Sequence, residues 1–156
     1  MDWKTAASQA AVLAAVVATT GFILGWKQHK QAKVRFGYDL LDDMIEDESV
    51  CNLLDVLDTQ HAAQKVVLVT ALEKIGKSVT AEEEQFQYDF DGFLWYLDRF
   101  EHAIQSGVTS FDVLRMPTGY YLLQLAKHRQ IVEHYMEAVG YDRARSFARR
   151  FKFWTT

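Results

Sequence analysis

The sequence predicts an all-α protein, in which one N-terminal transmembrane helix continues into a cytoplasmic bundle of four to five helices. No window of the chain alternates apolar and polar residues as a half-buried strand does. Apolar side chains recur instead at helical spacing, as at Phe86, Phe90, Phe93 and Leu97, and glycines stand where such stretches end. Beyond the N-terminal segment roughly 120 residues remain, which is enough for one compact core.

The transmembrane helix is predicted from an uncharged stretch, Thr5–Trp26, that spans 22 residues. A helix of this length covers about 33 Å, close to the thickness of the hydrocarbon core of a bilayer. Trp3 and Trp26 bracket it, as aromatic side chains do at membrane interfaces. Basic residues follow the stretch and almost none precede it, which places the C-terminal domain of a single-pass protein in the cytoplasm.

Three other interpretations of the stretch compete with a helix that spans the membrane and associates with copies of itself. A cleaved signal peptide has its positive charge before the apolar region, whereas here the charge comes after it. A buried core helix of a soluble protein fits the many alanines, which are only weakly apolar. A plain tether fits the length and the flanks equally well.

Small residues argue against the plain tether, because they recur in alternating steps of four and three along one helix face. Such a seam lets helix backbones approach closely inside lipid, and it predicts packing with other copies of the helix. The predicted packing residues are Ala7, Ala11, Ala14, Ala18, Gly21 and Gly25. Gln9 and Thr20 lie on the bulkier side, nearly in line along the helix, and are candidates for lining a pore.

With the transmembrane helix assigned to residues 1–26, the rest of the chain divides into a basic collar and stalk helix, residues 27–47, and a cytoplasmic helical domain, residues 48–156. Within the domain, Gly76 ends one helix, and Thr80 with Glu83 forms a capping box for the next, which stops at Gly107. A short helix over Phe111–Met116 is expected to end at Pro117. A long helix then runs from Thr118 to Gly140, where the glycine closes it.

Charge is segregated along the chain, because residues 39–140 carry nineteen of the 21 acidic side chains. The two ends are basic and are expected to lie at an anionic membrane surface, although arginine interleaved with aromatic residues also fits RNA. The single cysteine, Cys51, forms no internal disulfide, in agreement with a reducing cytoplasm. The residues predicted to contact the membrane surface or RNA are Lys27, Lys30, Lys33, Arg35, Arg143, Arg145, Arg149 and Arg150.

The sequence contains no glycine-rich phosphate loop, no zinc-spaced cysteines and no serine nucleophile elbow, so we expect no cofactor and no metal. One pair has chemical meaning: Arg129 and His134 are separated by four residues. An imidazole that moves protons and a guanidinium that holds phosphate cleave RNA without metal. The two side chains point some 140° apart on a straight helix, so a joint site requires a bent helix or a partner chain. The alternative is a surface arginine and a histidine at the edge of the core.

The Arg129–His134 spacing resembles the motif of the HEPN nuclease superfamily, which is arginine, four to six residues, then histidine. Together with the single N-terminal membrane helix and the small all-α domain, it makes the chain similar to the accessory membrane protein of type VI-B CRISPR systems. That resemblance implies a HEPN-like bundle and a homo-oligomeric ring that forms a membrane pore. It also implies antiviral defence at the bacterial inner membrane beside an RNA-guided, RNA-cutting effector, with Arg129 and His134 in a divergent motif for which a catalytic and a structural role are both open. The stretch DFDGFLWYLDRFEHAIQSGVTSFDVL also looks like a wider family of bacterial anchor-plus-helices proteins.

Three functions follow as hypotheses, in order of preference. The first is a homo-oligomeric pore that depolarises or permeabilises the membrane during phage attack, with lipids and the effector as partners. The second is a passive single-pass adaptor. The third is a membrane-tethered ribonuclease that uses Arg129 and His134, and an enzyme is the least favoured of the three.

Overall fold

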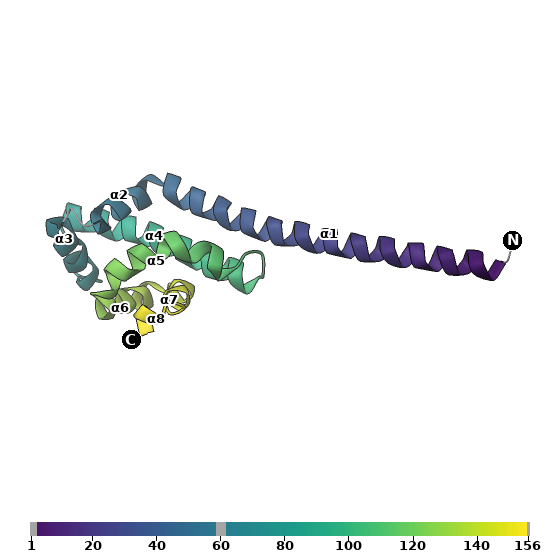
Figure 1. Ribbon diagram of the computed structural model, residues 1–156. Helices are drawn as coiled ribbons and strands as arrows, with labels where there is room; N and C mark the ends of the chain where they lie inside the picture. The colour runs from purple at the N-terminus through teal and green to yellow at the C-terminus, as the bar shows by residue number, and fades with distance from the viewer. Residues whose placement is uncertain (1–2, 59–61, 156) are drawn as a thin grey trace.

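The computed structural model describes the backbone of residues 3–58 and 62–155, and side chains in residues 17–58 and 62–155. Every regular element in these ranges is a helix, so the predicted all-α class is confirmed. The helices are α1 (Trp3–Glu46), α2 (Glu48–Leu57), α3 (Ala62–Glu73), α4 (Ala81–Gln105), α5 (Phe111–Ala126), α6 (Arg129–Val139), α7 (Asp142–Ala148) and α8 (Lys152–Thr155). Figure 1 shows α1 as a rod with the N-terminus at its free end and the other helices gathered at its far end.

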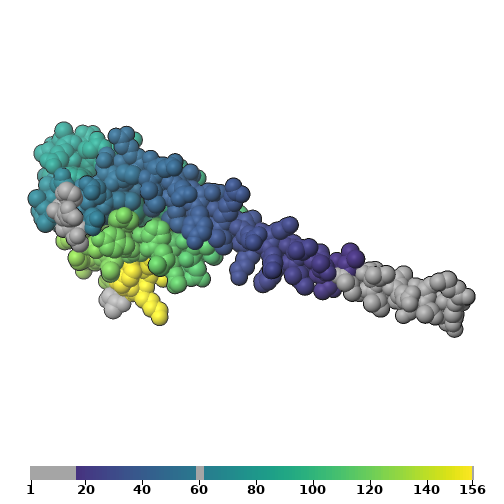
Figure 2. All heavy atoms as spheres, turned by 45° about the horizontal axis from the view of Figure 1, so that its top comes forward, coloured from purple at the N-terminus to yellow at the C-terminus, as the bar shows by residue number. Residues whose placement is uncertain are grey.

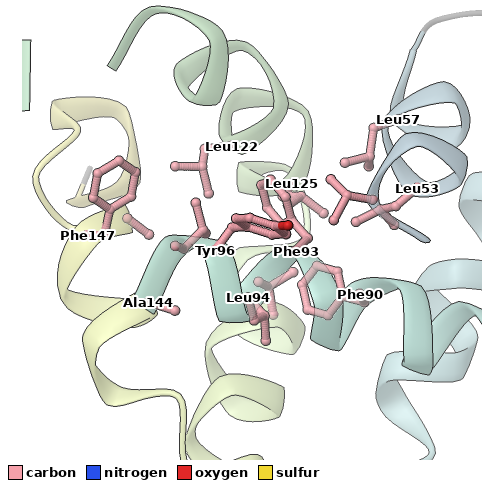
Figure 3. Close-up of a cluster of buried hydrophobic side chains, with 14 of the residues drawn as sticks. Leu53, Leu57, Phe90, Phe93, Leu94, Tyr96, Leu122, Leu125, Ala144 and Phe147 are labelled. Carbon is pink, nitrogen blue, oxygen red and sulfur yellow. The ribbon is translucent and has the colours of Figure 1, made fainter. Parts of the chain in front are cut away.

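Helix α4 forms the centre of the body and packs against α2, α3 and α7. Its apolar residues recur three and four positions apart, so one side of the helix is lined by rings and leucines and is buried. Figure 3 shows Phe90 and Phe93 of α4 between Leu53 of α2 and Leu125 of α5, with Phe147 of α7 in the same cluster. The aromatic spacing read from the sequence therefore belongs to the core.

Local signals in the sequence set several helix ends as predicted. The Thr80 hydroxyl accepts the Glu83 backbone N–H at 3.2 Å, and the Glu83 carboxylate accepts the Thr80 N–H at 2.9 Å, which completes the capping box. Gly76, Gly107 and Gly140 have φ values of 69°, 71° and 85°, a region that favours glycine because it has no Cβ.

Two predicted boundaries are wrong. Pro117 lies inside α5 rather than at the end of a short helix, and the long helix expected from Thr118 to Gly140 is divided into α5 and α6. Helix α5 continues through Pro117 because Leu114, Thr118 and Leu122 around it are all buried, and this packing outweighs the poor helix propensity of proline. The break falls at Lys127 and His128, where neither glycine nor proline marks it.

The last turns of α1 join the rod to the body. Leu40, Leu41 and Met44 are buried in the core, so this part of the predicted stalk packs with the domain. Two hydroxyls reach α1 carbonyls: Thr109 Oγ1 donates to Lys33 O at 3.0 Å, and the Tyr96 hydroxyl donates to Asp43 O at 3.0 Å. These contacts fix the angle at which the rod leaves the body.

Candidate functional site

The segment of α1 that precedes this joint has an exposed apolar surface. Phe22 is 77% exposed, Leu24 54% and Trp26 61%. Figure 2 shows the helix from residue 17 onward projecting away from the body. Phe22, Ile23 and Leu24 are consecutive, so at 100° per residue they point in three directions. The large apolar side chains therefore spread over more than half of the helix circumference at this level instead of forming one stripe toward the body, and the small residues of the seam occupy the remaining side.

The small-residue seam falls partly on described side chains. Ala18, Gly21 and Gly25 are exposed, and a Cβ added at either glycine would meet no atom within 4 Å. Thr20 is exposed as well. Ala7, Ala11, Ala14 and Gln9 lie outside the residues whose side chains the structure describes. Where it is described, the seam is thus open to an approaching helix.

The predicted transmembrane segment Thr5–Trp26 begins among residues whose side chains are not described. Among the residues that are described, no helix combines the length and the apolar character needed to cross a membrane.

The basic collar lies on the same free segment. Lys27, Lys30 and Arg35 are exposed and Lys33 is half-buried. None of the four has a carboxylate within salt-bridge distance in the described parts of the chain, whereas Lys30 Nζ lies 5.9 Å from the centre of the Trp26 ring. The collar is therefore available to an external anion.

Arg129 and His134 do not form a joint site within the chain. Arg129 begins α6, and its Nη1 donates to the backbone carbonyl of Trp154 at 2.7 Å, which ties α6 to α8. His134 lies further along the same helix and is exposed. No described contact connects the two side chains, so the geometry favours a structural role for Arg129.

The C-terminal arginines are engaged inside the domain. Arg143 lies 3.5 Å from Asp98, and Arg145 pairs with Glu137 and Asp142. Arg149 donates two hydrogen bonds to Glu133, and Arg150 donates two to Glu101, at 2.6 and 2.7 Å. These four side chains pair with individual carboxylates of the domain, which leaves less positive charge for a membrane or for RNA than the composition suggested.

The sequence alone did not identify the two carboxylates, Glu101 and Glu133, that bind Arg150 and Arg149. Glu101 is 3% exposed and receives the Arg150 fork, and Glu133 accepts the indole N–H of Trp154 at 3.0 Å. Hydrogen bonds from Arg149 and then from Trp154 hold the pKa of Glu133 below its ordinary value, against the opposing effect of burial. The partners lie 16 to 49 positions apart, and no local pattern connects them.

Comparisons with protein-family models, with curated proteins and with solved structures gave no match to this chain.

Proposed function

We propose that this chain is a homo-oligomeric protein of the bacterial inner membrane, anchored by α1, whose N-terminal helices associate into a pore that permeabilises the membrane. The supporting observation is the exposed apolar circumference of α1 around Phe22, Ile23 and Leu24. At about 25 cal/mol per Å² of apolar surface, leaving such rings and aliphatic chains in water costs several kcal/mol. Lipid and neighbouring helices remove this cost together.

The geometry of the rod supports an anchor in preference to a soluble coiled coil. A coiled coil has a narrow stripe of large apolar residues, whereas here the large residues point in several directions and the seam consists of small ones. The stretch from Lys27 to Gly37 spans about 15 Å, which holds the acidic body away from anionic headgroups while the collar reaches them.

Dye release from liposomes tests the pore. The purified chain in vesicles is expected to release a trapped fluorophore, alone or when the RNA-guided effector is added. Replacing Ala18, Gly21 and Gly25 together by leucine keeps the segment apolar and fills the seam, and we expect it to abolish release. The matched control, Val17→Leu with Ile23→Leu, adds no bulk to the seam and should leave release intact.

The outcomes separate the competing functions. Equal release by the seam variant and the control would contradict association through the seam. No release under any of these conditions, with a monomeric mass in detergent, would leave the passive adaptor. The role in antiviral defence rests on the resemblance to the type VI-B accessory family. It predicts fewer phage plaques when the chain and the effector are expressed together, and loss of that protection in the seam variant.

A further inference from the structure

A hollow of about 670 Å³ opens where α1 ends, between the start of α2 and the first half of α4. It lies at the opposite end of the joint from the free rod, so nothing in the membrane proposal uses it. Its lining residues are Asp47, Glu48, Ser49, Asn52, Gln85, Tyr88, Asp89, Asp91, Gly92, Trp95 and Tyr141.

The lining is negative and contains no lysine, arginine or histidine. Four carboxylates line the hollow, those of Asp47, Glu48, Asp89 and Asp91. The Asp47 carboxylate already caps α2 through the Ser49 and Val50 N–H groups and accepts the Tyr96 hydroxyl, so the other three are the ones open to a ligand. In the parts of the chain that the structure describes, no group of three or more potential ligands converges closely enough to hold a metal ion. Carboxylates spread around a volume of this size match a cation whose positive charge is spread over several atoms.

One of these carboxylates is deeply buried in the lining without a counter-charge. Asp89 is 3% exposed, and its described hydrogen bond comes from the Gln85 amide at 2.8 Å. No basic side chain pairs with it among the described residues. Burial raises the pKa of Asp89, and burial also raises the pKa of Asp91, which accepts the Tyr135 hydroxyl at 3.1 Å. Carboxylates that are buried although burial disfavours their charged form are typical of a binding site in which a ligand supplies the opposite charge.

Aromatic rings form the mouth of the hollow. Tyr88 is 68% exposed and Trp95 is 48% exposed, so both rings are accessible to a ligand. Trp95 already binds a cation, because the Arg99 guanidinium lies 4.6 Å from its ring centre. Its edge-to-face contact with Tyr96, at 4.9 Å between ring centres, holds the indole in position. Rings beside carboxylates are the surroundings that stabilise guanidinium and alkylammonium groups.

We propose that this hollow binds the arginine or lysine side chain of a basic segment in a protein partner, with the rings of Tyr88 and Trp95 and the carboxylates of Glu48 and Asp91 as the contacts. The mouth is open, so a small free cation would keep much of its hydration there. A side chain presented by a partner is positioned by the rest of that interface and loses less freedom on entry.

A parallel neighbouring copy of this chain does not supply that side chain. Its basic collar ends at Arg35, twelve residues before Asp47, which is about 18 Å along a parallel helix. The C-terminal arginines are already paired within their own domain. Neither basic block of a neighbouring copy therefore reaches the hollow, and we assign the partner as a different protein whose exposed basic segment complements the charge of the lining.

Fluorescence anisotropy with the detergent-solubilised full chain tests the proposal. The probe is a short labelled glycine–serine peptide that carries arginines, and its twin carries citrulline, which has the same shape without the charge. We expect the arginine peptide alone to bind. Tyr88→Leu should weaken binding about two- to fivefold, the effect of one exposed cation–π contact. Glu48→Gln with Asp91→Asn should weaken it by about tenfold or more.

A matched pair of charge changes separates the hollow from general attraction to an acidic body. Glu73→Gln with Glu84→Gln alters two exposed carboxylates outside the lining and gives the same net charge. This control should change binding less than about twofold at physiological salt, where distant charges are screened. Equal loss in both double variants, binding of the citrulline peptide, or binding of spermidine without the arginine peptide would each overturn the proposal. Far-UV circular dichroism confirms that each variant is folded.

Discussion

Two carboxylates on α4 are equally buried but have different surroundings. Glu101 and Asp89 are each 3% exposed. Glu101 receives two charge-assisted hydrogen bonds from Arg150, whereas Asp89 receives one from a neutral amide. A buried charge is tolerated when an opposite charge and hydrogen bonds compensate it. Glu101 with its partner Arg150 is therefore tolerated in the folded protein, whereas the charge of Asp89 lowers the free energy of unfolding.

Removing the cation next to Glu101 should destabilise the body. Arg150→Met keeps an apolar stem of similar length but leaves the buried carboxylate without a counter-charge. Because Arg150 is partly exposed, we expect a loss of about 2 kcal/mol in the free energy of unfolding, near the lower end for buried pairs. Denaturant titration measures it. Arg115→Met breaks an exposed pair with Asp112 and should cost less than about 0.5 kcal/mol. Equal losses in the two variants would contradict the assignment.

Neutralising Asp89 should have the opposite effect. Because folding raises the pKa of Asp89, the folded protein keeps this proton at pH values where the unfolded chain has released it. The stability that protonation contributes is present in acid and is lost as the pH rises through the raised pKa. Asp89→Asn still accepts the Gln85 amide and avoids that loss. We expect the variant to melt above the native protein at neutral pH and to match it below the ordinary aspartate pKa. A difference in melting temperature between the variant and the native protein that stays constant with pH would contradict a raised pKa of Asp89.

Sequence distance explains which residue contacts could be predicted. Thr80 and Glu83 meet because three positions along a helix start place them together, so the capping box is legible in the sequence. Arg150 and Glu101 meet because α7 packs on α4, and the hollow beside Asp89 exists because α2 packs on α4, so both depend on tertiary arrangements that no local pattern gives. Arg129 and His134 have the spacing of the resembled motif, and the angle between them around the helix, which the sequence already gives, agrees with their separation within the chain.

At the scale of helices, glycine and capping residues predicted the helix ends correctly where tertiary packing favoured the same boundary. Glycines at positions 76, 107 and 140 end helices as predicted, because each adopts a positive φ. Pro117 has an equally strong local signal, yet the buried residues on either side keep α5 helical. The break between α5 and α6 has no local signal, because two packing surfaces of the body produce it rather than a residue with special backbone preferences.

Gly37 shows how packing also reverses helix propensity. Glycine to alanine inside a helix usually stabilises by up to about 1 kcal/mol. At Gly37 the added Cβ would lie 2.5 Å from Thr109 Oγ1 and 2.6 Å from Val113 Cγ1. Overpacking of this kind costs about 1–3 kcal/mol, so we expect Gly37→Ala to destabilise the body by about 1 kcal/mol in a denaturant titration. Gly25→Ala, where the Cβ would meet nothing within 4 Å, should leave the unfolding of the body unchanged.

Over the whole molecule, positive charge has two different uses. The C-terminal arginines are paired with carboxylates of the body, whereas the collar on α1 has no such partners among the described residues. The sequence predicted both basic blocks but assigned them the same role, because composition does not show which charges fold against each other. The basic side chains of the collar are therefore accessible to groups outside the body. Because the collar lies directly beside the apolar segment, it would determine the orientation of the proposed membrane protein.

The single cysteine makes that orientation measurable. Cys51 is exposed and lies in the body, so a maleimide that cannot cross membranes reports the side on which the body lies. In intact spheroplasts we expect no labelling of the native chain, and full labelling after the inner membrane is opened. Replacing Lys27, Lys30, Lys33 and Arg35 by glutamine removes the positive-inside bias, so a fraction of the chains should insert inverted and become labelled without permeabilisation.

Arginines of the C-terminus provide the control for this experiment. Orientation is set by basic residues within about 15–20 positions of the membrane segment, and those of the C-terminus lie far beyond that distance. Arg143→Gln with Arg145→Gln should therefore leave Cys51 protected in intact spheroplasts. Labelling of the native chain without permeabilisation would place the body outside the cytoplasm. Full extraction of the native chain by alkaline carbonate would show that α1 does not span a bilayer, because a spanning helix stays in the membrane when peripheral proteins are stripped from it.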